Sequence, residues 1–302
     1  MKIVKILGGL GNQMFQYALY LALKEHFPDE EIKIDTSCFC AYPLHNGYEL
    51  NKLFHIDAKE ASFIEKAKIA YPYLNYRFWQ IAKRILPKRK SMLTEPKNEE
   101  FTTSVFTQYG NCYYDGYWQN ERYFKNIRNK VLATFCPITV SEKNIEYGKL
   151  LKNKKSVSIH VRRGDYINNT LYGNICTKDY YLKAIERIKG IKEIDTFCVF
   201  SNDIMWCKEN LSSFLNECNV IYVDWNHGMN SYQDIYLMSQ CNNNIIANSS
   251  FSWWGAWLNQ NIDKTVICPK KWNNIPNSLF EMPDDWMTVS YTHLTLPTIL
   301  LV

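Results

Sequence analysis

The sequence predicts an α/β protein made of two Rossmann-like halves. Residues 1–36 give a strand, a glycine turn, a helix and a second strand, and the chain beyond residue 155 alternates strands with helices. The length of 302 residues suits two domains of ordinary size. A hydrophobic content of 46% and a charged content of 22% are typical of a soluble protein with a substantial core.

The first half, residues 1–150, opens as a doubly wound unit. We expect a strand over residues 2–7, a glycine turn over 8–13, a helix over 14–27 and a strand over 31–36. The segment that follows residue 59 is basic and aromatic, and we expect it to be helical in two pieces. A strand over 111–118 and a helix over 120–135 complete this half.

The second half, residues 151–289, follows a charged stretch near residues 140–155. We expect strands over residues 156–161, 196–200, 219–223, 243–247 and 265–269, and helices over 177–190, from about 204, over 231–241 and over 251–260. Alternation of this kind is typical of a parallel sheet that helices cover on both faces.

Residues 290–302 do not continue this pattern. The segment reads SYTHLTLPTILLV, without caps or periodicity, and resembles the translation of a sequencing adapter. We therefore interpret it as a non-native, adapter-derived tail and leave it out of the fold prediction.

Charge, cysteines and the N-terminal segment point to a cytoplasmic protein. The net charge of +5 suits an anionic ligand but is too small to predict nucleic-acid binding. The 10 cysteines are scattered without a C-x-x-C pair, so we expect reduced thiols. The N-terminal segment turns polar too early for a signal peptide, and no window of about 18 apolar residues predicts a membrane span.

The segment HVRRGD, residues 160–165, places two permanent positive charges where a predicted strand becomes a loop. Guanidinium groups match phosphate oxygens two at a time. Adjacent residues of an extended segment point to opposite sides, so we expect Arg162 and Arg163 to have different tasks. One faces a ligand, and the other pairs with Asp165 or another carboxylate. Two solvated surface arginines are the alternative.

A second polar segment, residues 248–252, stands where another strand becomes a helix. Free backbone N–H groups and hydroxyls at a helix start form an anion site, whereas ordinary N-capping by one serine is the alternative. The candidate residues are Asn248, Ser249, Ser250, Phe251 and Ser252. We expect the tryptophans at positions 253, 254 and 257 to pack in the core rather than to stack on a nucleobase.

Asn202 and Asp203 follow a third predicted strand at the same edge of the sheet. A carboxylate at this place accepts hydrogen bonds from a nucleobase or a ribose. Capping of the next helix by Asn202 or Asp203 explains the pair equally well.

The glycine turn of the first half departs from the dinucleotide fingerprint G-x-G-x-x-G. Gly9 and Gly11 fit it, but Met14 stands where the third small residue belongs, and the downstream acid is only loosely supplied by Asp35. Asn12 and Gln13 instead predict a site lined by amides. A nicotinamide-dependent oxidoreductase and a non-enzymatic binding module are therefore the weaker alternatives to an enzyme that binds a diphosphate.

The sequence gives no metal-ligand spacing. Aspartates never occur as D-x-D, and histidine and cysteine form no cluster of the kind that binds zinc. We expect arginine and helix amides, rather than a divalent ion, to stabilise a departing diphosphate.

Five segments in order resemble the bacterial α-1,2-fucosyltransferases of glycosyltransferase family 11: GGLGNQMFQYA, HVRRGDY, SNDIMWC, ANSSFSWWGAWL and PKKW. HVRRGDY fits the H-x-R-R-x-D signature of the related fucosyltransferases. The resemblance covers the chain up to the tail. It implies a GT-B-like fold in which two Rossmann-like domains face a cleft, with residues 1–150 on the acceptor side and residues 151–289 binding GDP-fucose.

The resemblance also implies the reaction. L-Fucose passes from GDP-fucose to the 2-hydroxyl of a terminal galactoside with inversion and without a metal or other cofactor, in the synthesis of surface polysaccharide or glycan. The sequence leaves open which galactoside is the acceptor, and whether it is free, lipid-linked or part of a repeating unit.

Residue roles carry over by position. Arg162 or Arg163 contacts the departing diphosphate, and His160 and Asp165 shape that site. Asp203 reaches toward the nucleoside. Ser249, Ser250 and Ser252 bind phosphate oxygens, and Asn12 lines the cleft from the other domain. The base that removes the acceptor proton stays open between Asp165 and His160.

The basic aromatic segment at residues 71–90 has two interpretations. It docks peripherally on the inner face of the membrane, where lipid-linked acceptors reside, or it is an acceptor-domain helix with a solvated basic face.

Overall fold

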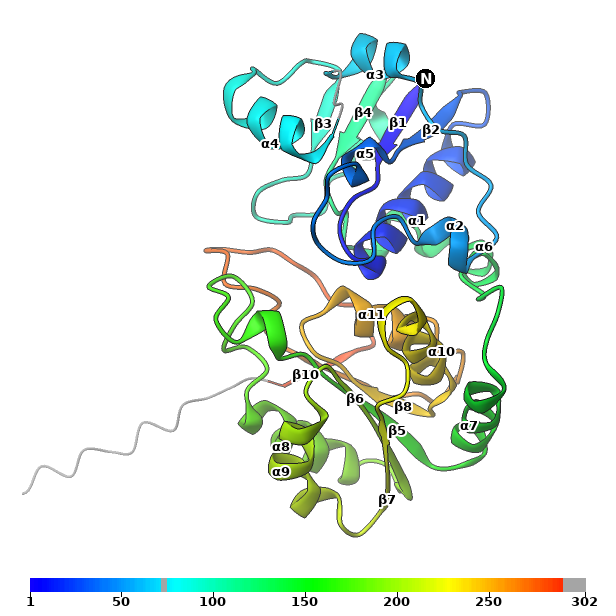
Figure 1. The fold of residues 1–302 in the computed structure, drawn as a ribbon, viewed down its shortest axis with the longest axis vertical. Coiled ribbons are helices and arrows are strands. Elements are labelled where there is room, and N and C mark those ends of the chain that lie inside the picture. Colours follow the sequence, from blue (N-terminus) through cyan, green and yellow to red (C-terminus); the bar gives the residue numbers. More distant parts are fainter. Residues whose placement is uncertain (72–74, 290–302) are drawn as a thin grey trace, which may run out of the picture.

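Two parallel β-sheets, one above the other in Figure 1, form the framework of the protein. The computed structural model describes residues 1–71 and 75–289. The predicted tail, residues 290–302, lies outside the described residues. Every strand pairing in the described part of the chain is parallel, as the sequence predicts.

The upper sheet has the strand order β2-β1-β4-β3. Its strands are β1 (Lys2–Lys5), β2 (Ile32–Asp35), β3 (Met92–Thr94) and β4 (Cys112–Asp115). Its helices are α1 (Leu10–His26), α2 (Leu50–Leu53), α3 (Phe63–Ile69), α4 (Tyr76–Ile85), α5 (Ser104–Thr107) and α6 (Arg128–Thr134).

The prediction of a continuous helix over residues 120–135 is wrong for the first half of that range. The side chain of Asn120 accepts a hydrogen bond from the backbone N–H of Arg122 (2.9 Å), which starts a tight turn. Two 3₁₀ turns, Glu121–Tyr123 and Lys125–Ile127, therefore precede α6.

The lower sheet has the strand order β10-β9-β8-β5-β6-β7. Its strands are β5 (Ser156–Val161), β6 (Thr196–Ser201), β7 (Asn219–Val223), β8 (Asn243–Ile245), β9 (Val266–Pro269) and β10 (Met287–Val289). The helices of this half are α7 (Glu142–Asn153), α8 (Lys178–Lys189), α9 (Ile204–Leu215), α10 (Tyr232–Gln240) and α11 (Ser250–Trp257).

Helices cover both faces of each sheet. Successive strand residues point to opposite sides of a sheet, and apolar residues on each side pack against helices. In the upper sheet Val4 packs in the core under α1, and Ile3 packs under α3 and α4. In the lower sheet Val199 packs against α8 and α9, whereas Phe200 packs against α7 and α10. This confirms the predicted α/β architecture.

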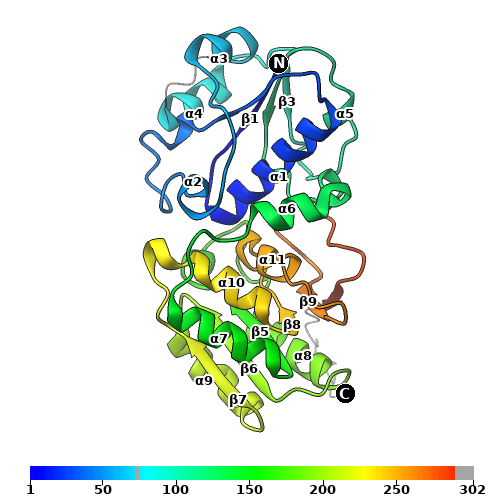
Figure 2. The ribbon, with the colours of Figure 1, turned by 90° about the vertical axis from the view of Figure 1, so that its right-hand side faces the viewer.

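The two halves meet where α1 of the upper half lies against α11 of the lower half, and Figures 1 and 2 both place these helices side by side. The ring of Phe15 lies 4.5 Å from the ring of Trp253 and 5.0 Å from that of Trp254, centroid to centroid. Trp257 is also buried. The tryptophans of α11 therefore pack in the core, as the sequence predicts, and one aromatic cluster joins the two halves.

Helix α7 crosses the predicted domain boundary at residue 150. Its Leu151 is buried in a cluster with Leu237 of α10, and Asn144 donates a hydrogen bond to Gln233 of α10 (2.7 Å). The helix thus packs on the lower half, and the division of the chain into domains stays a prediction.

None of the helices in the described ranges is long and apolar enough to cross a bilayer. The ten cysteines are free thiols.

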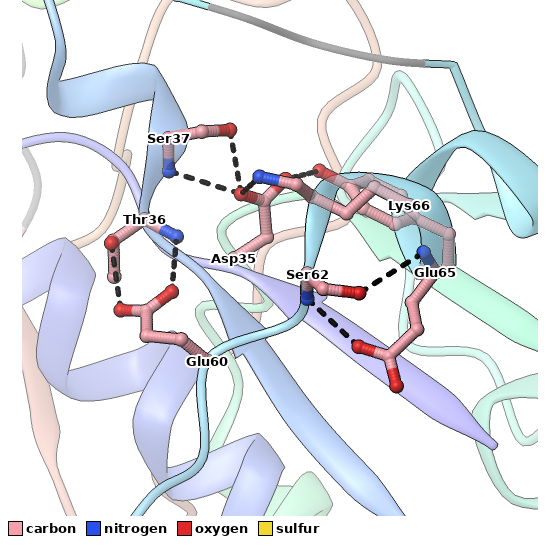
Figure 3. Close-up of polar contacts among 8 residues, drawn as sticks. Asp35, Thr36, Ser37, Glu60, Ser62, Glu65 and Lys66 are labelled. Atoms are coloured by element: carbon pink, nitrogen blue, oxygen red, sulfur yellow. Dashed lines mark hydrogen bonds and ion pairs between the residues drawn. The ribbon is translucent and has the colours of Figure 1, made fainter.

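A buried carboxylate at the end of β2 fastens α3 to the upper sheet (Figure 3). Asp35 is fully buried and accepts hydrogen bonds from the N–H and hydroxyl of Ser37, the phenol of Tyr113 and the ammonium group of Lys66, the last at 3.0 Å. A capping box between Ser62 and Glu65 begins α3 and so sets the place of Lys66. Asp35 therefore has a structural task and is not exposed as the ribose-binding acid of a dinucleotide site.

We predict that Lys66→Met lowers the free energy of unfolding by about 3–5 kcal/mol, because it leaves the Asp35 carboxylate buried without its cation. Urea denaturation measures this loss. Lys68→Met, at an exposed position of the same helix, is the control and should stay within about 0.5 kcal/mol of wild type. Equal stability of the two variants would contradict the assigned role.

Candidate functional site

A cleft of about 580 Å³ lies between the two sheets and takes its walls from both halves. Parallel strands of the lower sheet end at this cleft, where α/β sheets bind their ligands. Most of the residues predicted from sequence line it: Gly9, Gly11, Asn12, His160, Arg162, Asp165, Asn202, Asn248, Ser249, Ser250 and Phe251. The other predicted residues, Gln13, Arg163, Asp203 and Ser252, lie outside the lining.

The two adjacent arginines point to different sides of the loop after β5. Arg162 lines the cleft, its Nη2 is 2.8 Å from Oδ1 of Asp165, and its guanidinium lies 5.5 Å from the ring centre of Tyr166. Arg163 turns away from the cleft. Its Nε lies 3.1 Å from Oδ2 of Asp203, and its guanidinium covers the ring of Trp206 at 4.3 Å. Arg162 is therefore the arginine available to a ligand in the cleft.

Asp203 does not reach the cleft, because two other contacts use its carboxylate. One oxygen accepts the backbone N–H of Trp206 (3.1 Å) and caps α9, and the other pairs with Arg163. Its neighbour Asn202 lines the cleft and accepts the backbone N–H of Arg163 (3.0 Å). The structure thus favours capping for Asp203 and leaves Asn202 as the residue that faces a ligand.

His160 is a neutral, buried wall of the site. Burial and, to a smaller extent, the positive charge of Arg162 lower its pKa to about 3. Its Nδ1 has no hydrogen-bond partner among the described residues, and its ring lies 5.8 Å from that of Phe251. With this pKa the imidazole is neutral at pH 7, so His160 shapes the site without acting as an imidazolium acid.

Two helix N-termini meet at the cleft. Gly9 precedes α1 and Ser249 precedes α11, and neither residue caps its helix with a side chain. The indole of Trp254 donates to the carbonyl of Gly11 (2.9 Å). A Cβ at position 11 would lie 2.6 Å from the carbonyl carbon of Ser250, so only glycine permits this approach. The positive ends of both helices therefore face the same space.

A chain of amide hydrogen bonds crosses the cleft between the halves. Asn12 accepts from Nε2 of Gln119 (2.6 Å), and Oε1 of Gln119 accepts from the indole of Trp272 (3.0 Å). Asn12 thus lies in the cleft wall as predicted, held by Gln119, which the sequence did not single out.

Two predicted polar residues are buried and hold structure instead. Gln13 donates to the carbonyls of Gly8 and Gly47 (both 2.8 Å) and accepts the N–H of Glu49 (2.9 Å), so it anchors the loop at residues 41–49. Ser252 directs its hydroxyl to carbonyls of its own helix start, those of Ala247 and Ser249. Neither side chain is free to bind a phosphate or a sugar.

The loop at residues 41–49 supplies cleft residues that the sequence analysis missed. His45 takes a left-handed φ of 59°, and its ring lies within 3.4 Å of the place where a Cβ on Gly9 would be. Partial burial lowers the pKa of His45, Arg162 lowers it too, and Asp165 raises it. Asn46 donates to the carbonyl of Gly228 across the cleft (3.3 Å). The His-Asn-Gly run was the available signal, because it is a turn sequence.

Tyrosines form the opposite walls at one end of the cleft. Tyr42 and Tyr76 of the upper half have ring centres 4.9 Å apart, and Tyr166 and Tyr172 of the lower half stack at 5.2 Å. Aromatic walls with a few polar groups between them are typical of small-molecule sites.

A half-buried acid stands at the far end of the cleft, beyond β6 and β7. Burial raises the pKa of Asp234 to about 7, and a hydrogen bond from Asn226 (2.8 Å) opposes this rise. Both residues line the cleft. Asp234 is not among the site residues predicted from the sequence.

Within the described residues, no group of three or more His, Cys, Asp or Glu side chains is arranged to hold a metal ion.

The model of the family described as glycosyl transferase family 11 matches residues 1–290. The chain belongs to this family. It is 34% identical over 297 residues to an alpha-1,2-colitosyltransferase of Escherichia coli, with 95% of this chain and 98% of the relative covered. It is 33% identical over 309 residues to the O-antigen biosynthesis glycosyltransferase WbnK of the same species, with 93% and 98% covered.

More distant proteins match in part or in outline. The galactoside alpha-(1,2)-fucosyltransferase 2 of mouse is 31% identical over 105 residues, 34% of this chain and 30% of its own. A crystal structure of POFUT1 in complex with GDP is 14% identical with a TM-score of 0.45, covering 88% of this chain and 98% of that one. The E. coli ADP-heptose heptosyltransferase II is 12% identical with a TM-score of 0.41, covering 96% and 90%. Membership of family 11 makes the protein a glycosyltransferase. Its two parallel sheets form the two-sheet fold that the resemblance implied.

We predict that Gly11→Ala lowers the free energy of unfolding by about 1–3 kcal/mol, because the added methyl group forces α1 away from α11. Urea denaturation measures this loss. Gly190→Ala is the control, since its nearest neighbour would be a carbonyl oxygen at 3.5 Å. A Gly11→Ala variant as stable as Gly190→Ala would contradict the close approach.

Proposed function

We propose that the protein transfers L-fucose from GDP-fucose to the 2-hydroxyl of a terminal galactoside, with inversion and without a metal ion. The observation that carries the proposal is the position of Arg162, which faces a cleft where two uncapped helix N-termini converge. Membership of family 11 and relatives named as fucosyl- and colitosyltransferases support the reaction class and the type of sugar.

The donor lies along the ends of the lower strands. The diphosphate contacts Arg162 and the N-terminus of α11, since this pair supplies a planar cation and free amides. The nucleoside extends past Asn202 toward Asn226 and Asp234, because these residues continue the cleft along the order β5-β6-β7. An ionised Asp234 accepts hydrogen bonds from the N–H groups of guanine.

The sugar then faces the upper half, where the galactoside enters between the tyrosine walls. The acceptor oxygen attacks the anomeric carbon from the side opposite the diphosphate, and the bond from that carbon to the phosphate oxygen breaks. The electron pair of the broken bond goes to the diphosphate, which Arg162 stabilises. Asp165 is a positioning residue, because its ion pair at 2.8 Å fixes the direction of the guanidinium.

His45 accepts the proton that the acceptor hydroxyl loses. Its imidazole lies over Gly9 on the acceptor side, it is neutral at pH 7 because its pKa is lowered, and no hydrogen bond to the described residues occupies it. His160 and Asp165, the candidates from sequence, fit less well. His160 belongs to the buried wall, and Asp165 is paired with Arg162.

A lipid-linked galactoside in surface polysaccharide synthesis is the acceptor we propose. One relative is named for O-antigen biosynthesis, which agrees with this choice.

The test is transfer of radiolabelled fucose from GDP-fucose to lactose in EDTA. We predict that Arg162→Lys lowers kcat by about 10²–10³, because a lysine cannot place two donors on the diphosphate. Arg163→Lys is the matched control and should lose less than about tenfold, since Arg163 pairs with Asp203 in a partly exposed contact. Collapse of the Arg163 variant with an active Arg162 variant would overturn the assignment. GDP-colitose serves as a second donor, and transfer of that sugar alone would replace fucose in the proposal.

We predict that the wild-type rate falls as the pH drops below about 6.5, as His45 takes up a proton at its lowered pKa. His45→Gln should lower kcat by about 10² and remove this acid limb. Arg162 and Asp165 face His45 from the lower half and Tyr42 from its own loop, so the rate profile is compared with that of Asp165→Asn. His55→Gln, at an exposed position outside the cleft, is the control. Retention of both rate and acid limb in His45→Gln would remove His45 from the mechanism.

A further inference from the structure

Helix α4 presents an apolar stripe to solvent. Of its ten residues only Ala82 is buried, and Trp79 is half-buried against the sheet. Phe78, Ile81 and Ile85 recur at spacings of three and four, so they share one face of the helix. Their exposed fractions are 38%, 56% and 73%. Contiguous exposed apolar side chains of this kind mark an interaction surface, whereas single ones do not.

Cations flank the stripe without any acid among them. From Lys66 to Thr94 the chain contains lysine and arginine but no aspartate or glutamate. Arg77 and Arg84 lie beside the stripe at a spacing of seven, and Lys88 and Lys90 follow the helix at exposed positions. Within residues 1–71 and 75–289, no carboxylate lies within ion-pair distance of these four cations.

The helix begins at the wall of the cleft. Tyr76 is its first residue and lines the cleft, where its ring lies 4.9 Å from that of Tyr42. Its backbone N–H donates to the carbonyl of Cys40 (3.1 Å), which ties the start of α4 to the loop that carries His45. In Figure 1 the rest of α4 lies at the outer side of the upper half, next to β3. A ligand bound beside α4 therefore lies next to the end of the cleft that the tyrosines line.

We infer that residues 76–90, helix α4 and the basic segment after it, dock the protein on an anionic lipid bilayer. An apolar stripe with flanking lysine and arginine is the pattern of a helix that lies in the membrane interface. The apolar side chains enter the acyl boundary while the cations contact anionic headgroups. A second copy of the chain is the less suitable occupant, because it would bring the same unpaired positive charges against this surface.

This inference rests on the proposed function in one respect: docking on the bilayer would bring the cleft to a lipid-linked acceptor. The bilayer keeps a lipid-linked galactoside beside α4, and the tyrosine walls receive its sugar end. The docking itself needs neither donor nor acceptor, so it is testable on its own.

The experiment is cosedimentation of the full chain with vesicles of phosphatidylethanolamine and phosphatidylglycerol, compared with vesicles of phosphatidylcholine alone. We expect wild type to cosediment with the anionic vesicles and not with the neutral ones. High salt should release the protein from the anionic vesicles. The variants Ile81→Asp/Ile85→Asp and Lys88→Glu/Lys90→Glu should each bind at least about tenfold more weakly. Ile262→Asp, at a position 97% exposed in the lower half, and Lys152→Glu/Lys154→Glu are the matched controls and should bind like wild type.

Transfer of fucose to soluble lactose distinguishes a failure of the docking inference from a failure of the proposed function. The α4 variants should keep wild-type rates on lactose, because the substituted residues lie outside the cleft. Wild type that ignores anionic vesicles, or α4 variants that bind as well as wild type, would overturn the docking surface while leaving the transferase intact. A change of molar mass in solution caused by the α4 variants would overturn it too, in favour of a second copy. Vesicle binding without any transfer to lactose would instead count against the proposed function.

Discussion

The close approach of two helix N-termini at Gly11 is the contact on which the rest of the structure depends. It is a backbone contact, since the main chain of Gly11 lies against the main chain at Ser250, and the indole of Trp254 seals it by donating to the Gly11 carbonyl. A side chain at this position would separate the halves by its own thickness. The cleft exists in its observed width because glycine stands there, and the positive ends of both helices face one small space for the same reason.

The charge in the cleft depends on the different contacts of two adjacent residues, Arg162 and Arg163. Both adjacent arginines pair with a carboxylate, but Arg163 pairs with Asp203 and covers Trp206 away from the cleft, whereas Arg162 pairs with Asp165 inside the cleft lining. His160 adds no charge, because burial and Arg162 keep it neutral. The site thus holds one well-oriented cation rather than a diffuse positive patch. A departing diphosphate needs this arrangement, since a fixed cation does not have to reorganise as charge develops.

Much of the fold and of the cleft could be predicted from sequence because parallel strands end at one edge. The rule placed Arg162, Asn202 and Ser249 together without knowledge of the loops between them. It could not tell which member of an adjacent pair faces inward, so Asn202 and Asp203 were both predicted, and only Asn202 lines the cleft. Amides at a helix start also look alike in sequence, yet Asn12 faces the cleft and Gln13 is buried.

The loop at residues 41–49 escaped prediction for a different reason. Its shape depends on left-handed conformations at Ala41, His45 and Gly47 and on hydrogen bonds to Gln13 from far along the chain. Left-handed φ is uncommon for alanine. The His-Asn-Gly run indicates a turn but does not show against which part of the fold the turn packs. Only the tertiary contact brings His45 over Gly9 and into the site.

The shared aromatic cluster also constrains how enzymes of this architecture can be recombined. Phe15 and Phe124 from the upper half and Trp253 and Trp254 from the lower half bury one another, so neither half covers its own apolar surface alone. A donor half transplanted from another glycosyltransferase would have to carry matching rings at these places, together with a small residue opposite Gly11. New pairings of donor and acceptor specificity are therefore more accessible through the cleft loops than through exchange of whole halves.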